Sequence, residues 1–174
     1  MKRLKASSLL SLAASVGALM AVSAPASAVT GALVSVNSAT DCVYVSGAVP
    51  KVSGNGNLYN SSTTATSVVN CPIIDDQGEL VQFGMAGVLL TYTDKSTAGN
   101  VSCTLSHVTT NGVTLTNGAA AASVGSTTTG GTLTLNPSAT VVTGGRWMVK
   151  CTLPKKGGSS AVLSGYDAYV VTGP

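Results

Sequence analysis

Apolar and polar side chains alternate along much of this chain, and the alternation predicts β-strands. The clearest case is the segment 146–153, whose odd-numbered positions are all apolar and whose even-numbered positions include Arg146, Lys150 and Thr152. A strand with this period of two buries one face and exposes the other. We therefore expect a half-buried strand in which Trp147 belongs to the core.

Further strands are expected where β-branched residues or the same alternation recur. In the segment 101–108, Val101, Cys103 and Leu105 face one way and the residues between them carry hydroxyl groups. The remaining expected strands are residues 42–46, 58–61, 66–70, 88–93, 113–116, 131–136 and 162–171.

Short turn sequences separate these segments and leave little room for helices. Asn-Gly pairs at residues 55–56, 111–112 and 117–118 accept positive φ at little cost. The segment 94–99 is expected to be a turn, and the alanines at 119–122 a loop. About eight or nine short strands with frequent turns predict an all-β fold, a single antiparallel β-sandwich with Greek-key or jelly-roll wiring.

The start of the chain has a different character. Basic residues are followed by an apolar run over residues 9–22, and small residues, Ala26 and Ala28, end the segment. This order is typical of a secretory signal peptide cleaved after Ala28. The expected organisation is therefore a signal peptide, residues 1–28, and a β-sandwich domain, residues 29–174. Secreted, periplasmic and cell-surface destinations all fit this segment.

Cleavage would leave a neutral protein of 174 − 28 = 146 residues. The net charge of +3 comes from Lys2, Arg3 and Lys5, so 9 − 3 = 6 basic residues would face 6 acidic ones. Such a surface does not favour nucleic acid as a partner. The next apolar stretch, residues 83–90, is far shorter than the roughly 20 residues that a membrane-spanning helix needs, so no membrane span is expected in the mature chain.

The chain has four cysteines, Cys42, Cys71, Cys103 and Cys151. An even number in an exported chain indicates two disulfides, for which three connectivities are possible. The sequences around Cys103 and Cys151 match almost position for position, which favours Cys103–Cys151 and Cys42–Cys71. Zinc is not expected, because the nearest two cysteines are 71 − 42 = 29 positions apart and there is one histidine.

Few residues could carry catalysis. His107 is the only histidine, and Ser102 and Ser106 lie near it in sequence, but the Gly-x-Ser-x-Gly motif of many hydrolases does not accompany them. His107 continues the inward phase of its strand, so we interpret it as a structural residue at a strand end. No catalytic residue and no cofactor is therefore expected.

The acidic residues Asp75, Asp76 and Glu79 form the one acidic cluster. Carboxylates in such a loop could contribute to a calcium site, but their spacing matches no established calcium loop, and a solvated turn explains them as well. No metal ligand is assigned.

Aromatic side chains could stack on sugars. The candidates are Tyr44, Tyr59, Tyr92, Tyr166, Tyr169 and Trp147. Tyr166 and Tyr169 should lie on opposite faces of the last strand, so that at least one of them points outward and hints at a contact surface.

Several motifs resemble those of a group of small exported bacterial proteins. They are Gly56-Asn57-Leu58-Tyr59-Asn60-Ser61-Ser62, Val69-Asn70-Cys71-Pro72-Ile73, the two segments around Cys103 and Cys151, and Leu163-Ser164-Gly165-Tyr166. The resemblance spans most of the mature chain and implies export, disulfides and a β-sandwich, and no activity. Fimbrial subunits are similar in being small, Thr-rich exported sandwiches, although they usually have a single disulfide.

Together these features predict an exported, non-enzymatic protein with a structural, adhesive or protein-binding role at the cell envelope or outside the cell. Its partner would be a protein or a surface glycan. The alternative is a small secreted hydrolase that uses His107, and replacement of His107 by Ala would distinguish the two.

Overall fold

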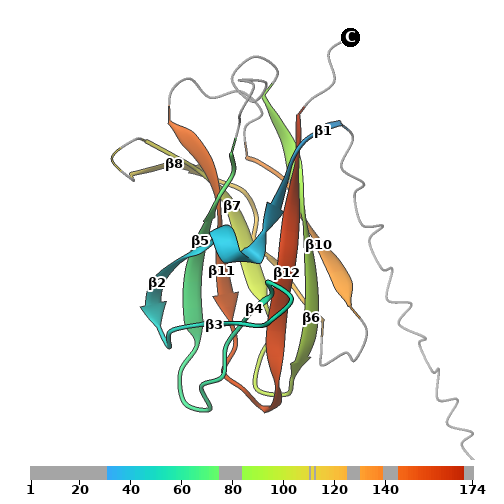
Figure 1. Cartoon of the computed structure of the whole chain (residues 1–174). Helices are drawn as coiled ribbons and strands as arrows, with labels where there is room; N and C mark the ends of the chain where they lie inside the picture. The colour runs from blue at the N-terminus through green and yellow to red at the C-terminus, as the bar shows by residue number, and fades with distance from the viewer. Residues whose placement is uncertain are drawn as a thin grey trace, which may run out of the picture.

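A computed structural model describes residues 31–74, 84–109, 111, 113–124, 130–138 and 145–170. Two antiparallel sheets, here called sheet A and sheet B, pack face to face (Figure 1). The prediction of an all-β, antiparallel β-sandwich is confirmed. Within the described ranges, no helix is long and apolar enough to cross a membrane.

Sheet A is built around its longest strand, β12. The order is β10-β6-β12-β4-β3, and β1 also pairs with β12. The strands are β1 (Ala32–Ser38), β3 (Lys51–Val52), β4 (Leu58–Tyr59), β6 (Met85–Ser96), β10 (Gly131–Leu135) and β12 (Gly158–Val170).

Sheet B has β11 at its centre, in the order β2-β5-β11-β7-β8, with β9 also paired to β7. The strands are β2 (Val43–Gly47), β5 (Ser67–Pro72), β7 (Ser102–Val108), β8 (Thr114–Asn117), β9 (Ala121–Ala122) and β11 (Arg146–Leu153). A single 3₁₀ turn, η1 (Ala39–Asp41), carries the chain from sheet A to sheet B.

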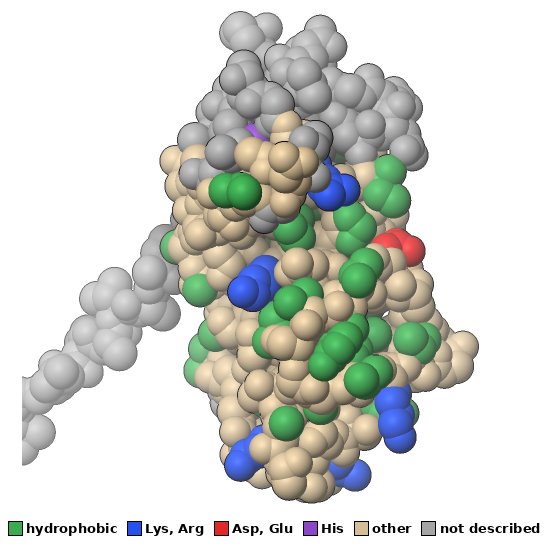
Figure 2. Space-filling view, turned by 90° about the vertical axis from the view of Figure 1, so that its left-hand side faces the viewer, with side chains coloured by type: hydrophobic (Ala, Val, Ile, Leu, Met, Phe, Trp, Pro, Cys, Tyr) green, Lys and Arg blue, Asp and Glu red, His purple; other side chains and the backbone are tan. Residues whose placement is uncertain are grey.

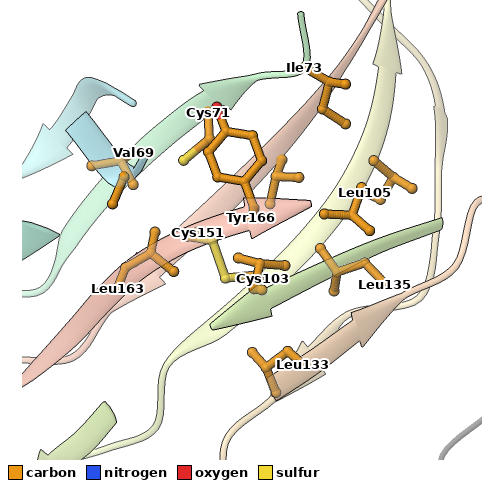
Figure 3. Close-up of a cluster of buried hydrophobic side chains, with 14 of the residues drawn as sticks. Val69, Cys71, Ile73, Cys103, Leu105, Leu133, Leu135, Cys151, Leu163 and Tyr166 are labelled. Atoms are coloured by element: carbon orange, nitrogen blue, oxygen red, sulfur yellow. A yellow bond between two sulfur atoms is a disulfide. The ribbon is translucent and has the colours of Figure 1, made fainter. Parts of the chain in front are cut away.

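The core fills the space between the sheets. The odd-numbered residues of β11 are buried and the even-numbered ones are partly or fully exposed, as their alternation predicted. Figure 3 shows Leu105 from sheet B and Leu133 and Leu163 from sheet A within one buried cluster. Trp147 is 5% exposed and belongs to this core, as expected.

Each expected strand is present, and the differences lie at strand ends and in short pairings. β6 continues through Asp94 to Ser96, so the prediction of a turn from residue 94 was wrong. This end of β6 pairs with β12, where Ala161 lies opposite Asp94, and the Asp94 side chain accepts hydrogen bonds from the backbone of Ser96 and Val101. The expected loop at 119–122 contains β9, because Ala121 pairs with Cys103 of β7. β1 was not predicted because a register shift between Leu33 and Ser35 interrupts its alternation.

Two disulfides link the cysteines of the sandwich. Cys42 is bonded to Cys71 of β5, and Cys103 of β7 is bonded to Cys151 of β11. These are the pairs that the matching sequences favoured. Both bonds involve strands of sheet B, so the covalent cross-links concentrate in that sheet.

Candidate functional site

The outer face of sheet B carries rows of side chains that the strand register sets side by side. Lys150 of β11 lies opposite Asn70 of β5 and Thr104 of β7. Met148, two residues earlier, likewise has Pro72 on one side and Ser106 on the other. Because directly paired residues share a face of a sheet, these rows extend the outward phase of β11 across its neighbours.

One half of this face forms an open hollow of about 330 Å³, which we call the polar groove. It is lined by seven polar side chains from β7, β8 and β11: Ser102, Thr104, Ser106, Thr114, Asn117, Lys150 and Thr152. A hydroxyl group can both donate and accept hydrogen bonds, an amide offers both kinds of group, and an ammonium group donates three. The polar groove can therefore hold a ligand that is rich in hydrogen-bonding groups.

The hydroxyl of Ser106 ties two strands together at this groove. Its Oγ donates to Oδ1 of Asn117 at 2.6 Å, which links the outward side chains of β7 and β8. Ser106 and Asn117 also face each other in the register of these strands. This bond fixes the position of the Asn117 amide, which also carries an N–H donor group.

The other half of the face has a second hollow, of about 360 Å³, which we call the mixed pocket. It is lined by Val43, Asn70, Pro72, Val108, Arg146 and Met148. Oδ1 of Asn70 is buried there without a hydrogen-bond donor among the described residues. An acceptor in this position can receive a hydrogen bond from a ligand that enters the pocket.

Strand β11, which contributes residues to both hollows, carries two positively charged side chains. Arg146 and Lys150 are both exposed on β11, and four residues of strand separate their Cα atoms by roughly 13 Å. Figure 2 looks onto this side of the molecule: blue side chains are spread over it, hydrophobic ones gather near its lower centre, and red appears only toward the right-hand edge.

Two of the three described acidic residues lie away from this face: Asp94 is fully buried, and Asp167 pairs with Val36 and Leu89 on sheet A. The third, Asp41, is exposed in η1, two positions before Val43 of the mixed pocket. Within the described part of the chain, Arg146 and Lys150 are the charged side chains that line the two hollows.

The structure places His107 in the core. Its side chain is 2% exposed and contacts Trp147 edge to face, with ring centroids 4.9 Å apart. The inward phase predicted for His107 is confirmed. Ser102 and Ser106 lie in the opposite phase, on the outer face, so the strand does not bring a serine hydroxyl and this imidazole together.

The tyrosines near the end of the chain divide as expected. Tyr166 is buried, and its hydroxyl donates to the carbonyl oxygen of Pro72 at 2.6 Å, whereas Tyr169 is half-buried on the other face of β12. Burial raises the pKa of the Tyr166 phenol above its ordinary value, and the negative charge of Asp41 raises it further.

The expected acidic cluster, Asp75, Asp76 and Glu79, lies outside the described residues. Among the residues that are described, no group of His, Cys, Asp and Glu side chains is placed to hold a metal ion. The polar groove was not predicted as a site. Its hydroxyl residues were visible as the polar phase of two strands, but only the pairing of β7 with β8 and β11 brings them together.

The chain is similar in overall fold to several solved structures at low sequence identity. The catalytic domain of Agl-KA is 12% identical with a TM-score of 0.48, over 82% of this chain and 28% of that one. Carbohydrate-binding module CBM36, in complex with calcium and xylotriose, is 11% identical with a TM-score of 0.42, over 76% of this chain and 97% of that one. A family 11 carbohydrate-binding module of a Clostridium thermocellum cellulosomal cellulase is 10% identical with a TM-score of 0.43, over 85% and 99%.

No protein family model and no curated protein sequence matches the chain. The structural similarities are too distant to transfer an activity or a ligand. The sandwich and its two disulfides agree with the resemblance to small exported bacterial proteins, and membership of that group stays a prediction.

Proposed function

We propose that the mature protein is an exported, non-enzymatic binding module that holds a surface glycan in the polar groove, in an adhesive role at the cell envelope or outside the cell. One observation carries this proposal: the described residues that line the groove are seven polar side chains. Five of the seven bear hydroxyl groups, which match the alternating donors and acceptors of a sugar ring.

The shape of the face suits an extended ligand. Neighbouring strands are spaced by about 4.8 Å, so the five strands from β2 to β8 span roughly 19 Å. Lys150 and Met148 lie between the two hollows, and a chain of sugar units could cross β11 and contact both. Such a surface gains affinity from several weak contacts rather than from enclosure.

The buried state of His107 supports a non-enzymatic function. A general base must come within hydrogen-bond reach of the proton that it removes, and His107 is packed against Trp147 in the core. The competing hypothesis of a secreted hydrolase requires this side chain to meet substrate. We therefore expect His107→Gln and His107→Ala to keep glycan binding and to differ from the native protein mainly in stability.

Export is part of the proposal. It is supported by the signal-peptide features of residues 1–28 and by two disulfides, which persist in oxidising compartments. Secreted, periplasmic and cell-surface locations all satisfy this requirement.

A glycan array probed with the mature protein tests the function. Binding should weaken about fivefold in Thr104→Val, which keeps the side-chain shape and removes a groove hydroxyl worth about 1 kcal/mol. Thr132→Val is the matched control, because Thr132 is exposed on β10 of sheet A. Capture of a protein partner with no binding to any glycan would contradict the proposal.

A further inference from the structure

We propose that the glycan is acidic, and that Lys150 and Arg146 pair with its carboxylate or sulfate groups. This inference rests on the glycan-binding function proposed above and specifies the chemical class of the ligand. It is carried by the position of the two cations, each of which lines one of the two hollows on the outer face of sheet B.

Lys150 is placed to combine charge with hydrogen bonding. Its exposed side chain stands between Thr104, which lines the polar groove, and Asn70, which lines the mixed pocket. An acidic group held by the Lys150 ammonium would bring the hydroxyl groups of its own sugar unit next to Thr104 and Thr152. A charged group and several neutral ones could thus be recognised together.

Arg146 supplies a second, separate contact for an anionic group. It lies opposite Val108 on β7 and lines the mixed pocket, roughly 13 Å along β11 from Lys150. A guanidinium group presents a planar fork that matches the geometry of a carboxylate or sulfate. Two cations at this separation fit an acidic group on more than one unit of a saccharide chain.

The small number of cations on this face favours an acidic saccharide over a nucleic acid or an acidic peptide. Two cations among five hydroxyl groups are too few for a nucleic acid, whose backbone contacts need many basic residues. Of the described acidic residues, Asp94 is buried and Asp167 lies on sheet A, so neither carboxylate adjoins the two cations. The excess of hydroxyl groups over cations favours a saccharide over an acidic peptide.

The test compares each acidic oligosaccharide with a neutral oligosaccharide that has the same sugar backbone. The mature protein is titrated with oligogalacturonate, oligomannuronate and a sulfated oligosaccharide, each beside its carboxyl-reduced or desulfated form, and with a poly-glutamate peptide. At low salt we expect at least one acidic form to bind fivefold or more tightly than its neutral counterpart. The preference should shrink as salt screens exposed charges.

Substitutions at Lys150 and Arg146 test whether these two cations cause the preference for acidic over neutral oligosaccharides. Lys150→Gln and Arg146→Gln should each reduce it about two- to fivefold, the range for exposed ion pairs. Lys95→Gln is the control, because Lys95 is exposed on β6 of sheet A, and it should keep the preference.

Two results would overturn the acidic-glycan inference and leave the glycan-binding function standing. They are equal binding of acidic and neutral forms that still depends on Thr104, and a preference that survives the loss of both cations. Binding of poly-glutamate that equals or exceeds that of every saccharide would overturn both proposals, as would a failure of every saccharide to bind.

Discussion

Cys103 and Cys151 face each other directly across β7 and β11, and a disulfide joins them with their Cα atoms 4.1 Å apart. The two strands present Thr104 and Lys150 to the polar groove on the opposite side of the sheet. The bond therefore fixes, from the core side, the two strands that supply most of the groove. It stabilises the fold and holds the proposed binding face in one geometry.

Replacing both Cys103 and Cys151 by Ala should lower the free energy of unfolding by about 4 kcal/mol. The bond closes a loop of 48 residues, and on the chain-entropy model a loop of that size contributes about this much. The matched variant removes Cys42 and Cys71, whose separation of 29 residues predicts about 3.5 kcal/mol. Denaturant unfolding measures both, and unchanged midpoints would contradict the structural role of the bonds.

Asp94 should be important for stability because its carboxylate accepts three hydrogen bonds within the protein. The donors are the backbone N–H groups of Ser96 and Val101 and the hydroxyl of Ser123. Asp94→Ala would leave these donors without that acceptor and should cost about 3 kcal/mol or more. Thermal and denaturant unfolding report the loss.

The control for Asp94 is Asp167→Ala. Asp167 is half-buried on β12, and a change at such a surface position should shift the free energy of unfolding by no more than about 0.5 kcal/mol. A similar decrease in the free energy of unfolding for Asp94→Ala and Asp167→Ala would show that the hydrogen bonds to Asp94 are not important for stability.

Tyr166 should make the protein less stable at alkaline pH. An ordinary tyrosine has a pKa of about 10, and the pKa of Tyr166 is raised in the folded state. As the pH rises above 10 the unfolded chain loses this proton first, so ionisation favours unfolding and the free energy of unfolding falls. Below that pH the contribution is fully present.

The Tyr166→Phe variant separates this effect from packing. At neutral pH it should be less stable by about 1 kcal/mol, because the hydrogen bond to Pro72 is lost. The difference from the native protein should shrink between pH 9 and pH 11, since the variant has no phenol at this position to ionise. Unfolding curves at several pH values, with Tyr169→Phe as control, would refute the account if the difference stayed constant.

Exported protein should begin at Val29, because cleavage is expected after Ala28. Intact-mass analysis of material from the envelope or the medium determines the start of the chain. A mass that includes residues 1–28 would contradict the proposal of a cleaved signal peptide.

The sequence predicted those features that depend on local alternation. The two faces of β11, the inward phase of His107 and the pairing of Cys103 with Cys151 all follow from positions two residues apart in extended strands. Asp94 was assigned to a turn because the segment 94–99 separates two expected strands. Two of its three donors, Val101 and Ser123, lie 7 and 29 residues away and are brought to it by the fold.

The candidate site could not be predicted for a similar reason. Ser102, Thr104 and Ser106 are visible in the sequence as the polar phase of one strand, and hydroxyl residues are common on solvated faces of sheets. Only the register places them beside Lys150 and Asn117. A groove formed by three strands is a property of pairing between distant segments, which alternation within one segment does not reveal.

Mapping the surface on which a glycan binds determines whether the polar groove is the binding site. The mature protein, labelled with ¹⁵N, is titrated with the best ligand from the glycan array while the backbone amide signals are followed. We expect the largest shifts on β7, β8 and the outward positions of β11, around Thr104, Asn117 and Lys150. Shifts confined to sheet A, or no shifts at saturating concentrations of glycan, would contradict this expectation.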